Sequence, residues 1–314
     1  MPEIILHHYP MSPASEKVRA ILGYKQMAWK SVHIPPVMPK PDVVALTGGY
    51  RRTPFLQIGA DVFCDTALIC NVLEHYKPDP GLCLPEERGA SLILSEWADT
   101  TLFRVSMAYN FQPAGAALLL GSMPADVAKA FVEDRKAMAA GTIRLRPGDA
   151  TSAYRSYLRR LSSMLDWQPF LIGKRPCLAD FAVYQCIWFT RTQVPALAGI
   201  LDATPAVKAW ADRMAAFGQG MPHAISATEA IAISARSTCQ EPGKLLKGEP
   251  FQDDHGISLG SQVTLAAESF GTETTTGELI AATRTHYSLR RQDARAGTVH
   301  VHFPRVGYVL RKAD

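Results

Sequence analysis

The sequence predicts three successive regions: an α/β domain, an all-helical bundle and a small all-β, barrel-like module. Strand-like and helical segments alternate up to residue 77, helical periodicity alone continues over 88–234, and five short alternating segments follow residue 250. The proline-rich stretch KPDPGLCLPEE separates the first two regions, and a polar stretch over 235–256 precedes the third. We therefore expect domains over residues 1–77, 88–234 and 250–314.

The composition is typical of an intracellular globular protein. The 314 residues are 47% hydrophobic, which is enough for two or three domains with their own cores. Because 33 basic and 29 acidic residues are well mixed, the net charge of +4 indicates neither a nucleic-acid nor a membrane partner. No run approaches the roughly 18 apolar residues of a membrane span, so we expect a cytoplasmic protein. The six cysteines form no CxxC pair and are expected to be reduced thiols.

The first domain is expected to begin with a strand over Glu3–His8 and a helix from Pro13. Proline is favoured at the first position of a helix, and Ser12 before it suits the N-cap. A second strand over Trp29–Ile34 and a short helical segment over Asp42–Leu46 follow. The order so far is that of a βαβ unit.

The stretch Tyr50–Tyr76 completes this domain. Phe55–Ile58 and Val62–Cys64 are predicted to form a hairpin around a tight turn. Asp65 or Thr66 then caps a helix whose apolar residues recur at helical spacing. The complete order of strands and helices is that of a thioredoxin-like domain.

Two features of this stretch point to ligand binding. A cis bond between Thr53 and Pro54 would leave the Thr53 backbone open to pair with an extended ligand, although most X-Pro bonds are trans. Asp65 and Thr66 lie at a helix N-terminus, where free N–H groups favour a bound carboxylate. A strand-starting proline and an ordinary helix cap are the structural alternatives.

Four segments in this order and spacing carry a resemblance to a known family: YPMSPASEKVRAIL, RRTPFLQIG, CDTALICNVLEHY and FLIGKRPCLADFAVY. Residues 1 to about 230 resemble a cytosolic glutathione transferase of the serine type. The resemblance implies glutathione as co-substrate, a small hydrophobic electrophile as its partner in the reaction, no metal, and a two-fold homodimer. It also implies a role in detoxification.

The same resemblance assigns roles to five residues of this sequence. In the family's pattern, the residue at Ser12 contacts the sulfur of glutathione. Thr53 and Pro54 position the tripeptide, and the Thr53 backbone pairs with its cysteinyl part. Asp65 and Thr66 hold the γ-glutamyl end.

The chemistry expected of Ser12 can be stated without the family. A free thiol has a pKa of about 8.5, so only a few per cent is thiolate at neutral pH. Hydrogen bonds from a hydroxyl and a helix N-terminus favour the charged sulfur, and a shift of about two pKa units corresponds to about 2.7 kcal/mol. Ser15 is an alternative donor, and Tyr9 is expected to line the site wall. Because both positions of a redox CPxC pair are serine, disulfide reductase activity is disfavoured.

Several other residues have two interpretations. Arg51 or Arg52 could clamp the glycyl carboxylate of glutathione, whereas solvated surface charge is the default. The predicted long helix Ala90–Phe111 would line the electrophile pocket or serve only the core; its candidate wall residues are Phe103, Arg104, Met107, Tyr109 and Phe111. The segment from Cys177 to Asp180 resembles the family's N-capping box and is expected to stabilise the fold.

The resemblance does not extend to the C-terminal module. Its five short segments predict a small antiparallel barrel of the SH3-like kind. His300 and His302 point to one face of a strand, with His286 as a third candidate, but the sequence arranges no carboxylate or thiol with them. We therefore expect these histidines to pack rather than to bind a metal.

Two functions are consistent with these patterns. The first is a glutathione transferase that activates the glutathione thiol for attack on a small hydrophobic electrophile. The second is a non-catalytic, glutathione-transferase-like binding or scaffold protein that uses its β module for interaction. Glutathione binding, together with the activity of a Ser12→Ala variant, separates the two.

Overall fold

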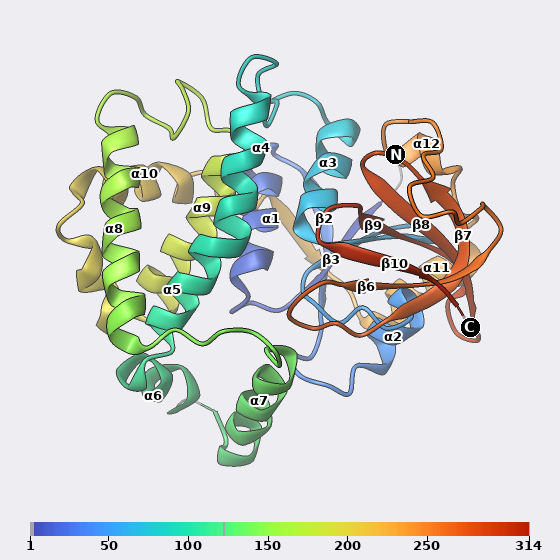
Figure 1. The fold of residues 1–314 in the computed structure, drawn as a ribbon, viewed down its shortest axis with the longest axis horizontal. Coiled ribbons are helices and arrows are strands. Elements are labelled where there is room, and N and C mark those ends of the chain that lie inside the picture. The colour runs from blue at the N-terminus through green and yellow to red at the C-terminus, as the bar shows by residue number, and fades with distance from the viewer. Residues whose placement is uncertain (1–2, 122, 314) are drawn as a thin grey trace.

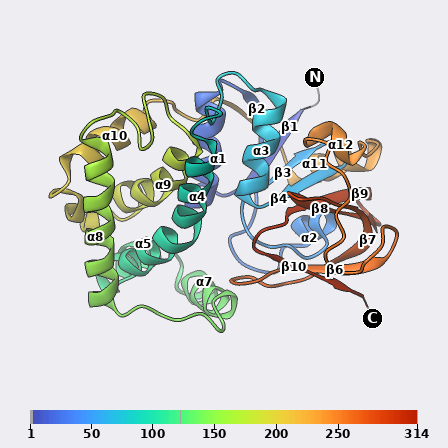
Figure 2. The ribbon, with the colours of Figure 1, turned by 45° about the horizontal axis from the view of Figure 1, so that its top comes forward.

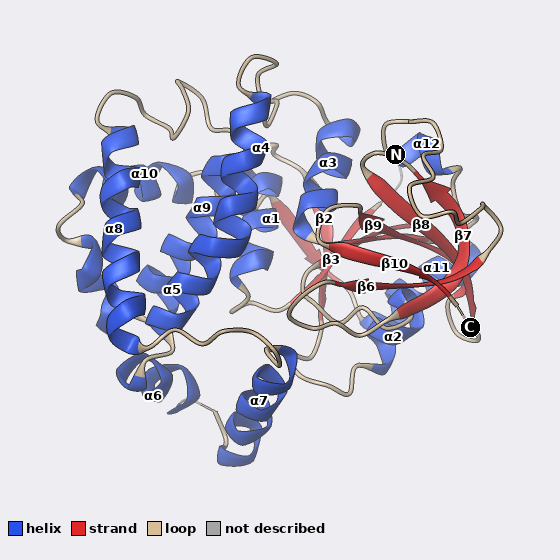
Figure 3. Cartoon of the chain, in the orientation of Figure 1, coloured by secondary structure: helices blue, strands red, loops and turns tan. Residues whose placement is uncertain are grey.

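The computed structural model describes residues 3–121 and 123–313. Strands gather on one side of the molecule and a bundle of helices on the other (Figures 1 and 3). The helices are α1 (Pro13–Tyr24), α2 (Pro41–Thr47), α3 (Thr66–Tyr76), α4 (Arg88–Trp97), α5 (Phe103–Asn110), α6 (Pro113–Gly121), α7 (Ala125–Met138), α8 (Pro147–Leu165), α9 (Leu178–Trp188), α10 (Pro205–Ala215), α11 (Ala227–Arg236) and α12 (Pro242–Leu245).

The strands form a single ten-stranded sheet. Its order is β10 (Tyr308–Lys312), β6 (Gln262–Ala267), β7 (Thr275–Ala282), β8 (His286–Asp293), β9 (Gly297–Pro304), β4 (Asp61–Cys64), β3 (Phe55–Ile58), β1 (Ile4–His8), β2 (Ala28–His33) and β5 (Met221–Ala224). β1 runs parallel to β2 and antiparallel to β3, as a thioredoxin-like domain requires. The predicted fold class is confirmed.

Two cores lie on opposite faces of this sheet. Helices α1 and α3 pack on one face, together with the helical bundle. Helices α2 and α11 pack on the other face, together with the strands of the C-terminal module. Strand β1 contributes to both cores, because Leu6 faces the bundle while its neighbour Ile5 faces the module. Figure 2 shows α1 and α3 between the bundle and the strands.

The C-terminal strands form the predicted antiparallel module, and this module is joined to the sheet of the first domain. β6 to β10 are antiparallel to one another, as predicted, but β9 pairs in parallel with β4 and so continues the sheet of the first domain. Without this pairing β4 would expose its backbone N–H and C=O groups at a sheet edge. The module therefore covers an edge that the thioredoxin-like elements alone leave open.

The helical region also differs from its prediction in detail. The expected long helix over residues 90–111 contains a π-helical turn, η1 (Ala98–Leu102), between α4 and α5. The sequence did not predict α6, nor strand β5, which adds a second parallel neighbour to β2. A further π-helical turn, η2 (Phe189–Gln193), and the 3₁₀ helix η3 (Pro195–Leu201) follow α9.

Asp180 stabilises the start of α9, as its capping position predicted. One carboxylate oxygen accepts hydrogen bonds from the Leu171 N–H at 2.9 Å and the Trp210 indole at 2.8 Å. The other accepts the Cys177 N–H at 2.9 Å. Asp180 is fully buried, so its carboxylate satisfies three N–H donors that water cannot reach.

Candidate functional site

Ser12 occupies the N-cap of α1. Its Oγ accepts a hydrogen bond from the Ser15 N–H at 3.1 Å, and its own N–H donates to the Tyr9 carbonyl at 3.1 Å. Because Oγ accepts, its hydroxyl hydrogen is left to donate elsewhere. Only 2% of Ser12 is exposed. The Ser15 hydroxyl is also buried and has no hydrogen-bond partner among the described residues.

The register of the sheet brings the other predicted residues to the same end of β1, β3 and β4 as Ser12. The Thr53–Pro54 bond is cis. Phe55 pairs with His7 of β1, so Pro54 lies level with the end of β1, from which the chain leads to Ser12. Phe55 also pairs with Cys64 of β4, so Asp65 follows at the same level.

The acid–hydroxyl pair caps α3 and already has partners. Asp65 has a left-handed φ of 74°, and one of its carboxylate oxygens accepts the Ala67 N–H at 3.0 Å. The other oxygen accepts the hydroxyl of Tyr308, from the C-terminal module, at 3.0 Å. Thr66 Oγ1 accepts a hydrogen bond from Lys17 Nζ at 3.1 Å.

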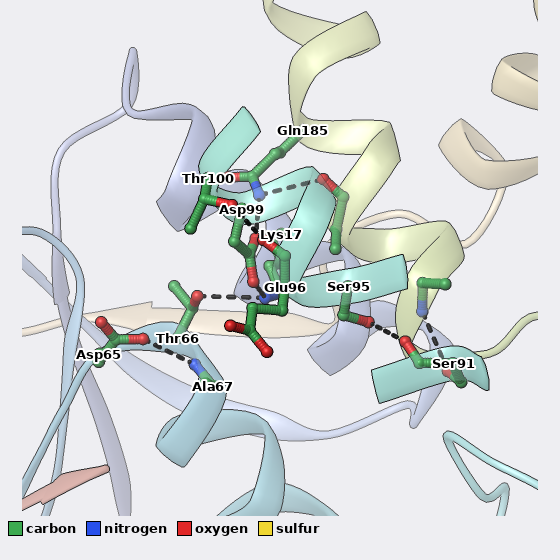
Figure 4. A network of polar contacts seen from close by, with 12 residues as sticks. Lys17, Asp65, Thr66, Ala67, Ser91, Ser95, Glu96, Asp99, Thr100 and Gln185 are labelled. Atoms are coloured by element: carbon green, nitrogen blue, oxygen red, sulfur yellow. Dashed lines mark hydrogen bonds and ion pairs between the residues drawn. The ribbon is translucent and has the colours of Figure 1, made fainter. Parts of the chain in front are cut away.

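Lys17 connects this pair to the helical bundle (Figure 4). Its side chain is fully buried, and its Nζ lies 2.5 Å from Asp99 in η1. Asp99 in turn accepts a hydrogen bond from the Gln185 amide at 2.6 Å. Burial alone would lower the pKa of Lys17, but the Asp99 carboxylate outweighs it and the pKa lies above its usual value. The lysine is therefore charged at neutral pH. Its contacts with Thr66 and Asp99 link α1 to α3 and to η1.

The two arginines before β3 are tied to other segments, and Arg51 is buried rather than solvated, which corrects the default expectation for that residue; the Arg52 side chain is 23% exposed. Arg51 is 6% exposed and forms ion pairs with Asp134 of α7 and with Glu273 of the module. Arg52 donates to the carbonyls of Ser269 and Phe270. Its guanidinium also lies 3.8 Å from Asp65 and stacks over the Tyr308 ring. Both guanidiniums therefore anchor neighbouring segments to the site.

Helix α7 of the bundle contacts the same end of these strands. Arg135 donates to the Tyr9 hydroxyl at 3.3 Å and to the Pro36 carbonyl at 2.8 Å. The Met138 carbonyl accepts the Gly271 N–H of the module at 2.9 Å. The helical periodicity expected over residues 88–234 includes α7, but no pattern in the sequence indicated that this helix would contact Tyr9.

An apolar cluster lies beside Ser12. Met11 packs with Met107 and Trp188 against a buried group made up of Leu119, Phe189 and Val194. Of the five expected wall residues, only Met107 belongs to this cluster. Tyr109 is instead 93% covered in the bundle core, with its hydroxyl donating to the Leu197 carbonyl, and Arg104 is exposed.

Phe111 and Phe103 lie outside this cluster and are only partly covered by neighbouring residues. The Phe111 ring stacks on Phe189 with centroids 6.2 Å apart, and the side chain is 39% exposed. Phe103 is half-buried against the bundle core. Trp188 and Met11 were missed by the sequence analysis, because a single tryptophan or methionine on a buried segment carries no signal of a pocket.

Within residues 3–121 and 123–313, no group of three or more His, Cys, Asp or Glu side chains has an arrangement that could hold a metal ion. No helix in the described part of the chain is long and apolar enough to cross a membrane.

The fold and this site define the class: the chain belongs to the glutathione S-transferase family. Residues 6–81 match the family's N-terminal domain, and residues 149–217 match its C-terminal domain. The chain is 38% identical to a GST-like protein from Pseudomonas syringae of known structure, over 100% of both chains, with a TM-score of 0.82. That similarity includes the C-terminal module.

Two further proteins are similar over the transferase part. FtsZ-localized protein A from Caulobacter vibrioides is 26% identical over 185 residues, which are 57% of this chain and 74% of that protein. A glutathione S-transferase from Sinorhizobium meliloti 1021 is 20% identical, with a TM-score of 0.52, over 68% of this chain and 88% of that one. The second likeness shows the fold alone.

Proposed function

We propose that the chain binds glutathione and activates its thiol for attack on a small hydrophobic electrophile. The observation that supports this most is the neighbourhood of Ser12. Its hydroxyl lies at the N-terminus of α1 with its hydrogen left to donate, and the preceding residue, Met11, belongs to a partly exposed apolar cluster. A hydroxyl that donates a hydrogen bond to the thiolate and an apolar surface for the electrophile would then lie side by side.

The predicted binding residues retain hydrogen-bonding groups that glutathione could use. Thr66 Oγ1 accepts from Lys17, so its hydroxyl hydrogen can donate to the carboxylate at the γ-glutamyl end. Each Asp65 oxygen accepts one hydrogen bond and has a second lone pair for the ammonium group. The backbone of Thr53 would pair with the cysteinyl part, beside Pro54.

The test is calorimetric glutathione binding and conjugation of glutathione to an aryl halide, using the full chain. Ser12→Ala should lower kcat/KM by about 10- to 100-fold, because about 1.4–2.7 kcal/mol of thiolate stabilisation is lost. The dissociation constant for glutathione should stay within about threefold, since the tripeptide's contacts remain. Ser163→Ala, at an exposed position of α8, is the matched control. Absence of glutathione binding at millimolar concentration would refute the proposal.

A second function is favoured by two specific observations: only 2% of Ser12 is exposed, and Asp65 and Thr66 are already hydrogen-bonded by Tyr308 and Lys17. In this alternative the chain is a non-catalytic binding or scaffold protein that contacts a protein partner through its β module. A relative named FtsZ-localized protein A suits such a role. Glutathione binding without turnover, unchanged by Ser12→Ala, would favour this alternative.

Cellular role and assembly belong to the same proposal. We place the protein in the cytoplasm as a homodimer that acts in detoxification. Light scattering on the purified chain measures its mass directly, and a monomeric mass of 34.3 kDa would contradict the dimer.

A further inference from the structure

Helix α7 lies on the surface of the molecule and makes little apolar contact with it (Figure 1). Of its 14 residues, all within the described part of the chain, only Met138 is buried. Val127 and Val132 are 41% and 48% exposed although both are apolar. A helix that buries so little apolar surface depends on specific polar contacts for its position, and its local opening costs little free energy.

Asp134, near the end of α7, supplies the central contact. Its carboxylate forms an ion pair with Arg51, and the same oxygen accepts the Met38 N–H at 3.3 Å. The other oxygen accepts a hydrogen bond from Arg135, the next residue of the helix, at 2.5 Å. The first domain therefore holds a carboxylate of α7 with one guanidinium and one backbone N–H.

Arg135 fastens α7 to the first domain at two further points. It donates to the Pro36 carbonyl at 2.8 Å and to the Tyr9 hydroxyl at 3.3 Å. The Tyr9 carbonyl accepts the Ser12 N–H, and Arg51 lies two positions before Thr53. Helix α7 thus connects the two sides of the proposed glutathione site, and Ser12 is 2% exposed while the helix is in this position.

Arg51 has a donor that Asp134 does not use. Its Nη2 contacts Asp134 and its Nη1 donates to Glu273 at 2.8 Å. Its Nε is buried and has no hydrogen-bond partner among residues 3–121 and 123–313. Nε and Nη2 lie on the same edge of the planar guanidinium, and that edge can bind both oxygens of one carboxylate. Asp134 therefore fills this carboxylate site only in part.

The charges around Arg51 also favour a further anion. Lys40 is 2% exposed, and its Nζ donates to the Arg51 carbonyl at 3.2 Å rather than to a carboxylate. Burial, together with Arg135 and Arg51, lowers the pKa of Lys40 to about 8. Three basic side chains thus face two carboxylates, those of Asp134 and Glu273. An excess of positive charge in a buried cluster attracts an anionic ligand.

We propose that the contact between Asp134 and Arg51, which we call the latch, is autoinhibitory. In the closed state the α7 carboxylate occupies an anion site of the first domain. A carboxylate of the ligand replaces it by binding Nε and Nη2 of Arg51 together, and α7 then swings outward with Arg135 and frees Tyr9. This inference rests on the proposed function, because glutathione supplies the competing carboxylate.

The experiment compares glutathione binding by the native full chain and by Asp134→Asn, using calorimetry. Asparagine keeps the size of the side chain but carries no charge to compete with the ligand. The dissociation constant should fall at least about tenfold, which corresponds to a latch that is closed about 90% of the time. Glu133→Gln, at an exposed position of the same helix, is the matched control and should leave the constant within about twofold. Unchanged or weaker binding by Asp134→Asn would overturn the latch and leave the proposed function standing.

Hydrogen exchange of the amides of α7 tests the latch apart from binding. Exchange over residues 125–138 should be at least about fivefold faster in Asp134→Asn than in the native chain, and saturating glutathione should produce a similar increase in the native chain. The amides of α8 should exchange at the same rate throughout. If neither change accelerates α7, the latch is refuted whether or not glutathione binds. If Asp134→Asn releases α7 but no variant binds glutathione, the proposed function and the competition for Arg51 both fail.

Discussion

Replacing Lys17 by methionine should both destabilise the protein and weaken its proposed site. Lys17 has a fully buried side chain, and its ammonium group contacts Asp99 at 2.5 Å and Thr66 at 3.1 Å. Methionine keeps most of the aliphatic volume of lysine but has no charge and no donor. The substitution therefore leaves a carboxylate without its cation and a hydroxyl without its donor.

The expected magnitude follows from how deeply the pair is buried. Removing one partner of a buried ion pair costs about 3–5 kcal/mol, because the other charge is left uncompensated. The Asp99 side chain is 22% exposed, so water recovers part of this loss. We expect the free energy of unfolding to fall by about 3 kcal/mol, at the lower end of that range.

Urea denaturation of the full chain measures this change. In the double variant Lys17→Met, Asp99→Leu, most of the stability should return, because neither buried charge remains. Lys129→Met, at an exposed position of α7, should change stability by less than about 0.5 kcal/mol. A loss below about 1 kcal/mol in Lys17→Met, or no recovery in the double variant, would show that this ion pair does not connect the two parts as described.

Three further predictions use the same measurement. Because the pKa of Lys17 is raised above 10.5 in the folded state, the advantage of the native chain over Lys17→Met should be constant at neutral pH and shrink above about pH 10.5; an advantage that persists there contradicts the ion pair. Asp180→Ala leaves three buried N–H donors unsatisfied and should cost about 3–6 kcal/mol, whereas Asp180→Asn keeps one acceptor oxygen and should cost about half as much. Tyr308→Phe should cost about 1–3 kcal/mol through the lost hydrogen bond to Asp65, against less than about 0.5 for Tyr157→Phe on α8; equal effects would argue against that bond.

The parts of the site that the sequence predicted depend on local interactions. Ser12 could be recognised as a cap because the serine precedes Pro13, and its acceptor role involves a backbone N–H only three residues away. Asp65 caps its helix through an N–H two residues away. The hairpin before it joins two short strands through a tight turn, and the turn fixes their register locally.

The parts that the sequence could not predict depend on residues far apart in the chain. Tyr308 contacts Asp65 across 243 positions, and Lys17 contacts Asp99 across 82. A tyrosine near the end of a strand, or a lysine in an amphipathic helix, has the same local pattern whether it meets solvent or a buried carboxylate. Arg51 shows the consequence: its position predicts a surface charge, and tertiary contacts bury it.

The β4–β9 pairing shows how strand register positions the side chains of the module. Side chains alternate between the faces of a sheet, so a shift of one residue would turn His300 away from Asp61 and bring Val299 or Val301 to that face. Both valines are fully buried, and such a shift would expose them to water. The hydrophobic residues of β9 therefore fix the register, and the register in turn places His300 and His302 beside the Asp61 carboxylate.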